Sequence, residues 1–229
     1  MEELSQKNDI HTKYVKEAYD IIAQHFDQTR SYLWPGVIDF YQYIPPNSFL
    51  ADIGCGNGKN INNQYTKSKN ITCFGCDITQ YFIETCHKQN KSVIKANNLN
   101  LPFKDNFFDA VLSVAVIHHF SEHTERIKAI QEIYRITKPN GIFLIQVWAH
   151  EQESDSKKNF NIGDNLVPWS LRNIKNKSIE LDLVKRYYYI CNKNIFQQLL
   201  IQALQNFNFD IFKFFYQKGN WVAYIRKFI

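Results

Sequence analysis

The feature that most constrains this chain is a glycine-rich loop, Asp-Ile-Gly-Cys-Gly-Asn-Gly, at residues 52–58. It follows an apolar run at residues 49–51 and precedes a segment that can be helical, so it predicts a strand-to-helix turn. Glycine lacks the side chain that would keep a ligand away from backbone N–H groups. Dinucleotide-binding folds usually show G-x-G-x-x-G. Here the third glycine comes one residue earlier and Asp52 precedes the first, which suits a cationic ligand end better than a phosphate.

The composition indicates one globular domain with appendages. The chain has 229 residues, of which 45% are hydrophobic and 15% aromatic, enough for one sizeable core. The net charge is +5, and residues 157–193 carry the same excess, with eight basic against three acidic side chains. We interpret this segment either as a solvated loop or as a patch that follows phosphate groups.

The N-terminus and the cysteines favour a reducing compartment, the cytosol or the nucleus. The first residues are polar and acidic, unlike a signal peptide, and no apolar run approaches the roughly 20 residues of a membrane span. The five cysteines are an odd number and do not indicate a disulfide framework. Cys73 and Cys76 lie in a strand pattern, where residues three apart point to opposite faces, so we expect no metal site there.

Helical and strand patterns alternate along the chain. Helices are expected at residues 11–26, 34–44, 60–65, 80–89, 125–136 and 194–205. Strands are expected at residues 49–53, 71–77, 92–96, 108–116, 141–149, 210–216 and 221–228, the last two joined by a tight turn. The alternation predicts an α/β fold whose mostly parallel sheet ends in an antiparallel hairpin. The divisions are a helical extension (1–46), a binding core (47–149), a basic insertion over the site (150–185) and a C-terminal helix with the hairpin (186–229).

In such sheets, ligands bind beyond the carboxyl ends of the strands. Asp77 ends the second strand about twenty residues after the glycine loop, the offset of a carboxylate that accepts from ribose hydroxyls. The alternative for Asp77 is a turn or helix-cap role, for which Thr79 competes. His118 and His119 follow the fourth strand and would lie beside the same ligand.

The loop and the order of elements resemble the class I S-adenosylmethionine-dependent methyltransferases. The resemblance implies a Rossmann-like fold with a seven-stranded sheet, S-adenosylmethionine as cofactor and S-adenosylhomocysteine as product. It also places Asn97 where the superfamily often has an Asp that accepts from the adenine amino group, a bond that an Asn carbonyl can also accept. The implied cofactor-binding residues are Asp52, Gly54, Cys55, Gly56, Asn57, Gly58, Asp77, Ile78, Asn97, Asn98, Leu99 and Val114.

Four segments resemble a narrower family, the eukaryotic tRNA methyltransferases that esterify 5-carboxymethyluridine at the wobble position, a domain also fused to AlkB-type hydroxylases. They are residues 19–30 with 34–35, residues 52–59, residues 113–119, and residues 167–169 with 186–189 and 220–222. The likeness runs from about residue 11 to the C-terminus. Asn97 departs from it, as does Phe120 in place of a Trp, and the stretch between Trp169 and Arg186 is short.

The reaction implied is attack of a carboxylate oxygen on a sulfonium methyl group. A carboxylic acid with a pKa near ~4 is ionised at neutral pH, so the site needs no general base and must instead orient the anion. Arg30 is the first candidate, because its guanidinium fork matches a carboxylate. The further catalytic candidates are His118, His119, Arg186 and Tyr187, with His118 preferred over His119 as the substrate contact.

Trp34 and Trp169 are predicted to stack on a displaced base. Each candidate has a structural alternative: a surface loop position for Arg30, a packing role for either histidine, solvent exposure for Arg186, strand packing for Tyr187, and core filling for the tryptophans.

The resemblance implies two partners. One is the tRNA anticodon stem-loop. The other is a small zinc-binding activator protein that would pair with the third-strand edge, because an exposed apolar edge is otherwise a liability. That edge consists of Ser92, Val93, Ile94 and Lys95.

Two other functions stay open: a small-molecule methyltransferase of the same fold and a non-catalytic S-adenosylmethionine-binding scaffold. A basic, exposed insertion would favour tRNA, whereas an apolar lid would favour a lipid or quinone.

Overall fold

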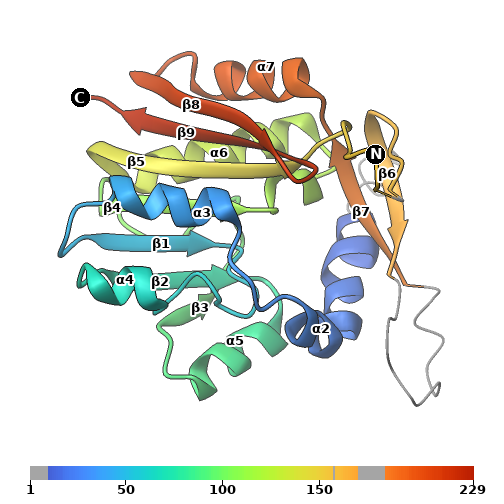
Figure 1. Ribbon diagram of the computed structural model, residues 1–229, viewed down its shortest axis with the longest axis horizontal. Helices are drawn as coiled ribbons and strands as arrows, with labels where there is room; N and C mark the ends of the chain where they lie inside the picture. Colours follow the sequence, from blue (N-terminus) through green and yellow to red (C-terminus); the bar gives the residue numbers. More distant parts are fainter. Residues whose placement is uncertain (1–9, 157, 170–183) are drawn as a thin grey trace.

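The computed structural model describes residues 10–156, 158–169 and 184–229, and its centre is a seven-stranded sheet in the order β3-β2-β1-β4-β5-β9-β8 (Figure 1). Strands β1 to β5 are parallel, whereas β9 is antiparallel to both β5 and β8. This arrangement confirms the predicted fold. The strands are β1 (Phe49–Ile53), β2 (Thr72–Asp77), β3 (Val93–Lys95), β4 (Phe108–Val114), β5 (Thr137–Trp148), β8 (Phe209–Gln217) and β9 (Asn220–Lys227).

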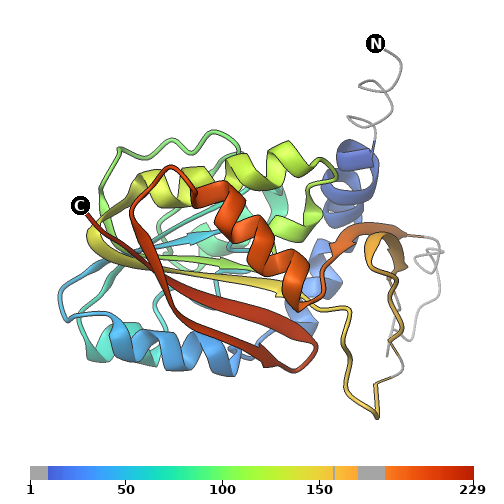
Figure 2. The same ribbon diagram turned by 90° about the horizontal axis from the view of Figure 1, so that it is seen from above.

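Helices cover both faces of the sheet. On one face lie α3 (Pro35–Phe40), α4 (Gln64–Ser68) and α5 (Gln80–Lys88), and on the other α6 (His123–Ile136) and α7 (Lys193–Leu204). Figure 2 shows α3 and α6 on opposite sides. Cys73 and Cys76 belong to the two different cores, as their spacing predicted. No helix within the described ranges is long and apolar enough to cross a lipid bilayer.

Two further units stand at the carboxyl end of the parallel strands. A π-helical turn, η1 (Thr12–Glu17), runs into α2 (Ala18–Thr29), and Pro35 starts α3, which a short 3₁₀ turn, η2 (Tyr41–Tyr43), follows. Strands β6 (Gly163–Pro168) and β7 (Lys185–Ile190) form a separate antiparallel pair. Figure 1 shows α2 between β7 and α5 at this open end. Neither β6 nor β7 is predicted as an element from the sequence, although strand packing is the alternative role given there for Tyr187; both strands are only six residues long and lie where the alternation of helices and strands is lost.

Left-handed residues move two element boundaries from where periodicity put them. The bounds expected for the helix at residues 60–65 are wrong. Helix α4 begins at Gln64, because Asn62 adopts φ 56° and cannot continue a helix. Asn63 instead caps α4, its side-chain carbonyl accepting from the N–H groups of Tyr65 and Thr66 at 2.9 and 3.2 Å. Strand β4 ends at Val114 because Ala115 adopts φ 62°.

The C-terminal hairpin closes as predicted. Gln217 pairs with Asn220, so the turn consists of Lys218 and Gly219, with φ 46° and 72°. Positive φ at both central residues matches the right-handed twist of the flanking strands. The turn lies at the same open end of the sheet as α2 and borders the cavity described below.

Helix α7 offers a matched test of how burial holds this fold. Phe196 is fully buried in the core beneath α7, whereas Ile201 on the same helix is 53% exposed. We expect Phe196→Ala to lower the free energy of unfolding by about 3–5 kcal/mol, because it leaves a cavity. Ile201→Ala should change it by less than about 0.5 kcal/mol. Urea denaturation checks both, and equal losses would contradict this core assignment.

Candidate functional site

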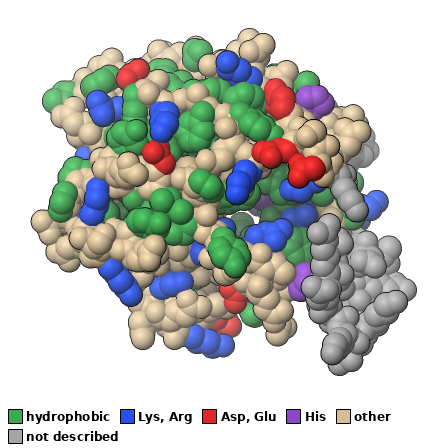
Figure 3. Space-filling model, viewed as in Figure 1, with side chains coloured by type: hydrophobic (Ala, Val, Ile, Leu, Met, Phe, Trp, Pro, Cys, Tyr) green, Lys and Arg blue, Asp and Glu red, His purple; other side chains and the backbone are tan. Residues whose placement is uncertain are grey.

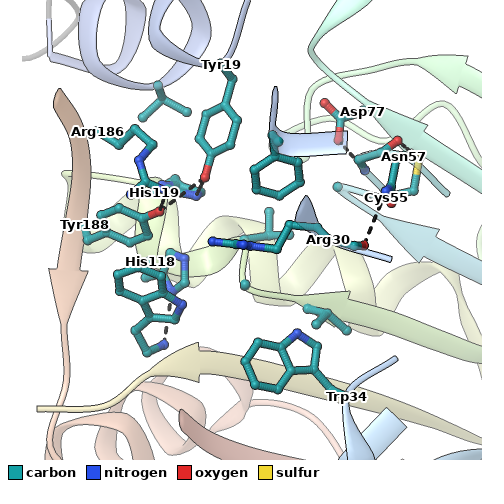
Figure 4. A pocket seen from close by; sticks show the side chains of 18 of the residues that line it. Tyr19, Arg30, Trp34, Cys55, Asn57, Asp77, His118, His119, Arg186 and Tyr188 are labelled. Atoms are coloured by element: carbon teal, nitrogen blue, oxygen red, sulfur yellow. Dashed lines mark hydrogen bonds between the residues drawn. The ribbon is translucent and has the colours of Figure 1, made fainter. Parts of the chain in front are cut away.

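A cavity of about 530 Å³ opens at the carboxyl ends of β1, β2 and β4, a size typical of small-molecule sites. Figure 3 shows it as a hollow bordered by Lys and Arg side chains. Figure 4 shows two ends. We name the end with Cys55, Asn57 and Asp77 the glycine end, and the end around His118 and Arg186 the histidine end. The guanidinium of Arg30 extends between them toward His118.

The glycine loop takes a conformation that only glycine adopts without strain. Gly54, Gly56 and Gly58 have φ of 73°, 52° and 68°. At Gly54 a Cβ atom would also stand 2.4 Å from a methyl carbon of Val116. The N–H groups of Gly54 and Cys55 both donate to the carbonyl of Cys76, at 2.8 and 2.9 Å, which holds the loop across the end of β2.

Asp77 joins the two loops of the glycine end. Its carboxylate accepts from the N–H of Gly56 at 2.8 Å and from the N–H of Thr79 at 2.9 Å, and it lines the cavity. Each oxygen keeps a lone pair for a ligand. Burial raises the pKa of Asp77, while these N–H groups oppose the rise. The turn role and the ligand role are therefore compatible, and Thr79 makes no side-chain cap.

Asp52 lies beneath the loop instead of in the cavity wall. It is 1% exposed and accepts from the side-chain amide of Asn60 at 3.1 Å. Burial raises the pKa of Asp52 to about 7. Any effect of Asp52 on a ligand is therefore electrostatic, through the loop.

The other predicted cofactor residues divide into two groups. Asn97 lines the cavity while its side-chain carbonyl also accepts from the N–H of Leu99 at 2.9 Å. Gly58 and Leu99, like Asp52, are not among the lining residues. The predicted residues that line the cavity are Gly54, Cys55, Gly56, Asn57, Asp77, Ile78, Asn97, Asn98 and Val114.

His118 presents a free donor at the histidine end. After the left-handed Ala115, a 3₁₀ turn, η3 (Ile117–His119), places its ring against β5. The Nδ1 atom accepts from the N–H of Trp148 at 3.1 Å, so the proton of the neutral ring lies on Nε2. Burial, and then the neighbouring His119 and Arg186, lower the pKa of His118 well below its usual value. Nε2 is buried and makes no hydrogen bond of good geometry among the described residues, although a backbone interaction with Ala115 opposes the fall in the pKa of the ring.

His119 has no free ring nitrogen. Its Nδ1 donates to the carbonyl of Tyr187 at 2.8 Å, and its Nε2 lies 3.1 Å from the hydroxyl of Tyr19. Burial lowers the pKa of His119 to about 3. Geometry therefore distinguishes the two histidines: His118 has a donor to offer a ligand, and His119 joins η3 to β7 and α2.

Arg186 is a buried cation without an anionic partner among the described residues. It is 5% exposed, and its Nη1 donates to the hydroxyl of Tyr188 at 2.5 Å. Its guanidinium lies 4.6 Å from the ring centroid of Trp169. Its Nε has no partner within the described ranges.

Two more cations face the histidine end. Arg30 is exposed beside the rings of Phe26 and Trp169, and desolvation followed by repulsion from Arg186 lowers its pKa. Burial and repulsion from Arg30 and Arg186 lower the pKa of Lys158 in the same way. Among the described residues that line the cavity, Asp77 is the one carboxylate, and it lies at the glycine end. The histidine end is thus suited to an anion.

The structure corrects the prediction for Tyr187. On β7, alternate side chains share a face, so Arg186 and Tyr188 line the cavity while Tyr187 points away and donates its hydroxyl to Asp164 at 2.5 Å. Tyr187 reaches the site only through its carbonyl, which holds His119. The period-two pattern of a strand was the signal that could have selected Tyr188.

The structure also corrects Trp169 as a base-stacking platform. It is 4% exposed, donates its indole N–H to His25 at 3.0 Å and does not line the cavity. Its rings instead support Arg30 and Arg186. Trp34 does line the cavity, near Lys59.

Sequence reasoning did not select several residues of the histidine end. Only tertiary packing assembles them, because they come from distant parts of the chain. They are Tyr19, Trp148, Lys158 and Tyr188.

Comparisons with known structures agree with this fold. The CcbJ methyltransferase from Streptomyces caelestis matches with a TM-score of 0.68 at 11% identity, covering 93% of this chain and 99% of that one. The 1,6-didemethyltoxoflavin-N1-methyltransferase of Burkholderia thailandensis, solved with S-adenosylhomocysteine, matches with a TM-score of 0.62 at 15% identity, covering 93% and 87%. At such identities the likeness concerns the fold alone.

Sequence comparisons are more specific. Residues 51–145 match the model of a methyltransferase domain family. A tRNA (carboxymethyluridine(34)-5-O)-methyltransferase of Arabidopsis thaliana is 44% identical over 150 residues, 65% of this chain and 36% of that protein. The chain thus spans about a third of the length of the first curated relatives that it matches.

A relative of similar length extends the match along the chain. The tRNA (carboxymethyluridine(34)-5-O)-methyltransferase of Schizosaccharomyces pombe is 34% identical over 225 residues, which cover 91% of this chain and 94% of that protein. The chain therefore belongs to the tRNA (carboxymethyluridine(34)-5-O)-methyltransferase family.

Proposed function

We propose that this chain transfers a methyl group from S-adenosylmethionine to the carboxylate of 5-carboxymethyluridine at the tRNA wobble position. The observation that carries this proposal is the presence of buried, unsatisfied hydrogen-bond donors at the histidine end. Arg186 Nε and His118 Nε2 are buried without acceptors among the described residues, and a buried donor left unpaired is costly. An ionised carboxylate bound at the histidine end would supply acceptors for such donors.

The glycine end fits S-adenosylmethionine, which supplies an electrophilic methyl group on a sulfonium. Asp77 has lone pairs suited to the two hydroxyls of a ribose, and the loop from Gly54 to Gly58 exposes backbone without side chains. Asn97 and Asn98 stand beyond β3, beside Asp77, where an adenine would lie.

The chemistry asks the protein to position an anion instead of moving a proton. The substrate carboxylate is ionised at neutral pH. One of its oxygens forms the new O–CH₃ bond as the S–CH₃ bond breaks and its electron pair returns to sulfur. His118 is neutral, so it orients the second oxygen without adding a second positive charge to that of Arg186.

The charges around the cavity favour a polyanion over a small apolar substrate. Lys59, Lys158 and Lys218 line it together with Arg30. Such a group of cations suits the phosphates of a single-stranded anticodon loop, and Trp34 offers a ring for a displaced base. Part of the basic insertion that the sequence places over the site, residues 170–183, lies outside the described residues, so the comparison with an apolar lid rests on these cations.

We also propose that an activator protein, the small zinc-binding subunit that the family resemblance implies, pairs with the edge of β3. In support, β3 is the outermost strand of the sheet at that side, and Ile94 is 43% exposed on it. An unpaired strand edge with an apolar side chain is a template for strand addition.

Carboxylate selection tests the proposed function. With the activator, S-adenosylmethionine and tRNA carrying 5-carboxymethyluridine, mass spectrometry should detect the methyl ester, and tRNA carrying the corresponding amide should give no product. His118→Phe should lower kcat/KM about 10- to 100-fold by removing a donor to a charged group. His123→Phe, at an exposed histidine on α6, should have little effect. No ester despite measured cofactor binding would refute the proposal.

Cofactor binding should depend on pH through Asp52. The cofactor carries a sulfonium and an ammonium against one carboxylate, and this net positive charge favours ionised Asp52, whose pKa is about 7 in the free protein. Binding below that pH must expel a proton, so affinity rises with pH. By calorimetry we expect Kd to be about tenfold weaker at pH 6 than at pH 8. Asp52→Asn should flatten this profile, whereas Asp210→Asn, at an exposed carboxylate, should not. An unchanged profile in Asp52→Asn would contradict this linkage.

If the activator pairs with the edge of β3, a substitution on that edge should prevent its binding and a substitution elsewhere should not. Ile94→Lys should abolish co-purification with the co-expressed activator, because it places a charge in the new interface. Ile201→Lys, at an isoleucine 53% exposed on α7, should leave it intact. A lone chain that is monodisperse and fully active would contradict the proposal.

A further inference from the structure

A row of hydrogen bonds joins four side chains behind the histidine end. Arg186 Nη1 lies 2.5 Å from the hydroxyl of Tyr188, which lies 3.3 Å from the hydroxyl of Tyr19. That hydroxyl lies 3.1 Å from Nε2 of His119, whose Nδ1 is 2.8 Å from the carbonyl of Tyr187. Figure 4 shows Tyr19, His119, Tyr188 and Arg186 meeting at one point. The row connects β7 with α2 and η3.

Chemistry fixes the direction of every bond in this row. The carbonyl of Tyr187 can only accept, so Nδ1 of His119 carries the proton and Nε2 accepts. The hydroxyl of Tyr19 must then donate to Nε2, which uses its one proton. Tyr188 therefore donates to the oxygen of Tyr19 and accepts from Arg186, which can only donate. The low pKa of His119, about 3, keeps the ring neutral and this order intact.

The far end of the row is the cation of the proposed acceptor site. Arg186 is fixed by one Nη1 bond and by stacking 4.6 Å from Trp169, and its Nε stays without an acceptor among the described residues. If the Tyr188 hydroxyl turned its own proton toward Arg186, it could no longer accept from Nη1, and the guanidinium would lose that hydrogen bond. That hydroxyl is held in turn by the oxygen of Tyr19.

We propose that Tyr19 is a positioning residue, whose hydroxyl orients Arg186 through Tyr188 and so sets the guanidinium for the acceptor carboxylate. This inference rests on the proposed function. Tyr19 does not itself need to touch the reacting atoms. The ring of Tyr19 packs edge-on against Phe26 and His119, with centroids 5.6 and 5.2 Å away. A phenylalanine keeps both contacts, so Tyr19→Phe removes only the hydrogen bonds.

Steady-state kinetics with the activator complex tests the positioning role. Tyr19→Phe should lower kcat/KM for the tRNA about tenfold through the loss of the two hydrogen bonds of its hydroxyl, while Kd for S-adenosylmethionine stays within about twofold of wild type. Tyr14→Phe is the matched control, a half-buried tyrosine earlier in the same helical segment that does not line the cavity.

A double-mutant cycle separates positioning from packing. In an Arg186→Lys background the fork is already lost, so Tyr19→Phe should lower kcat/KM by less than about twofold more. Full additivity of the two substitutions would overturn the inference, as would an equal loss of cofactor affinity in Tyr19→Phe.

Histidine ring ¹⁵N NMR provides a readout that needs no substrate. His119 should show the Nδ1–H tautomer and His118 the Nε2–H tautomer. Tyr19→Phe should shift the His119 Nε2 signal toward that of a nitrogen without a donor and leave His118 unchanged. An Nε2–H tautomer for His119 would overturn the inference.

Different results would overturn the proposed function and the positioning role of Tyr19. A wild-type complex that binds cofactor, keeps these tautomers and makes no ester would overturn the proposed function, and the role of Tyr19 with it. Normal ester formation that Tyr19→Phe leaves untouched would overturn the role of Tyr19 alone.

Discussion

Strand β1 pairs in parallel with β2 on one side and with β4 on the other, and this pairing positions the loops of the site. Asp52 is in register with Gly75 and with Leu112, so the three strands end at one edge of the sheet. The loops that leave them therefore converge. The glycine loop, the turn at Asp77 and the 3₁₀ turn with His118 meet there although they are far apart in sequence. Helix α2, β7 and the β8–β9 turn then enclose the space between them.

The enclosed space has a marked division of charge. Asp77 stands at the glycine end, Arg186 stands at the histidine end with Arg30 extending toward it, and Lys158 is close enough to both arginines to be repelled by them. A buried guanidinium without a carboxylate costs several kcal/mol unless other groups stabilise it. Here Trp169, Tyr188 and the row of hydroxyls to His119 provide part of that stabilisation. These groups do not offset the whole cost of burying the Arg186 guanidinium, which is a reason to expect an anionic ligand.

The sequence was sufficient to predict the features of the fold that depend on local backbone conformation. The glycine loop, the two-residue turn at Lys218 and Gly219 and the alternation of strands and helices all follow from backbone freedom and periodicity. Two boundaries shifted because Asn62 and Ala115 adopt left-handed conformations, which periodicity cannot reveal.

The histidine end was harder to predict because tertiary packing decides it. Without the knowledge that residues 185–190 form a strand, nothing separates Tyr187 from Tyr188, although only the second faces the cavity. Trp169 has the aromatic ring expected of a residue that stacks on a base, but it is buried behind Arg30 and Arg186. The resemblance to a family supplied the candidate residues, and the distances divided their roles.

The most direct test of the account is a crystal structure of the activator complex with S-adenosylhomocysteine and an anticodon stem-loop that carries 5-carboxymethyluridine. We expect the uridine carboxylate to accept hydrogen bonds from Arg186 and from Nε2 of His118, with one oxygen directed at the cofactor sulfur. A carboxylate bound elsewhere, with both of these donors satisfied by other groups, would contradict it.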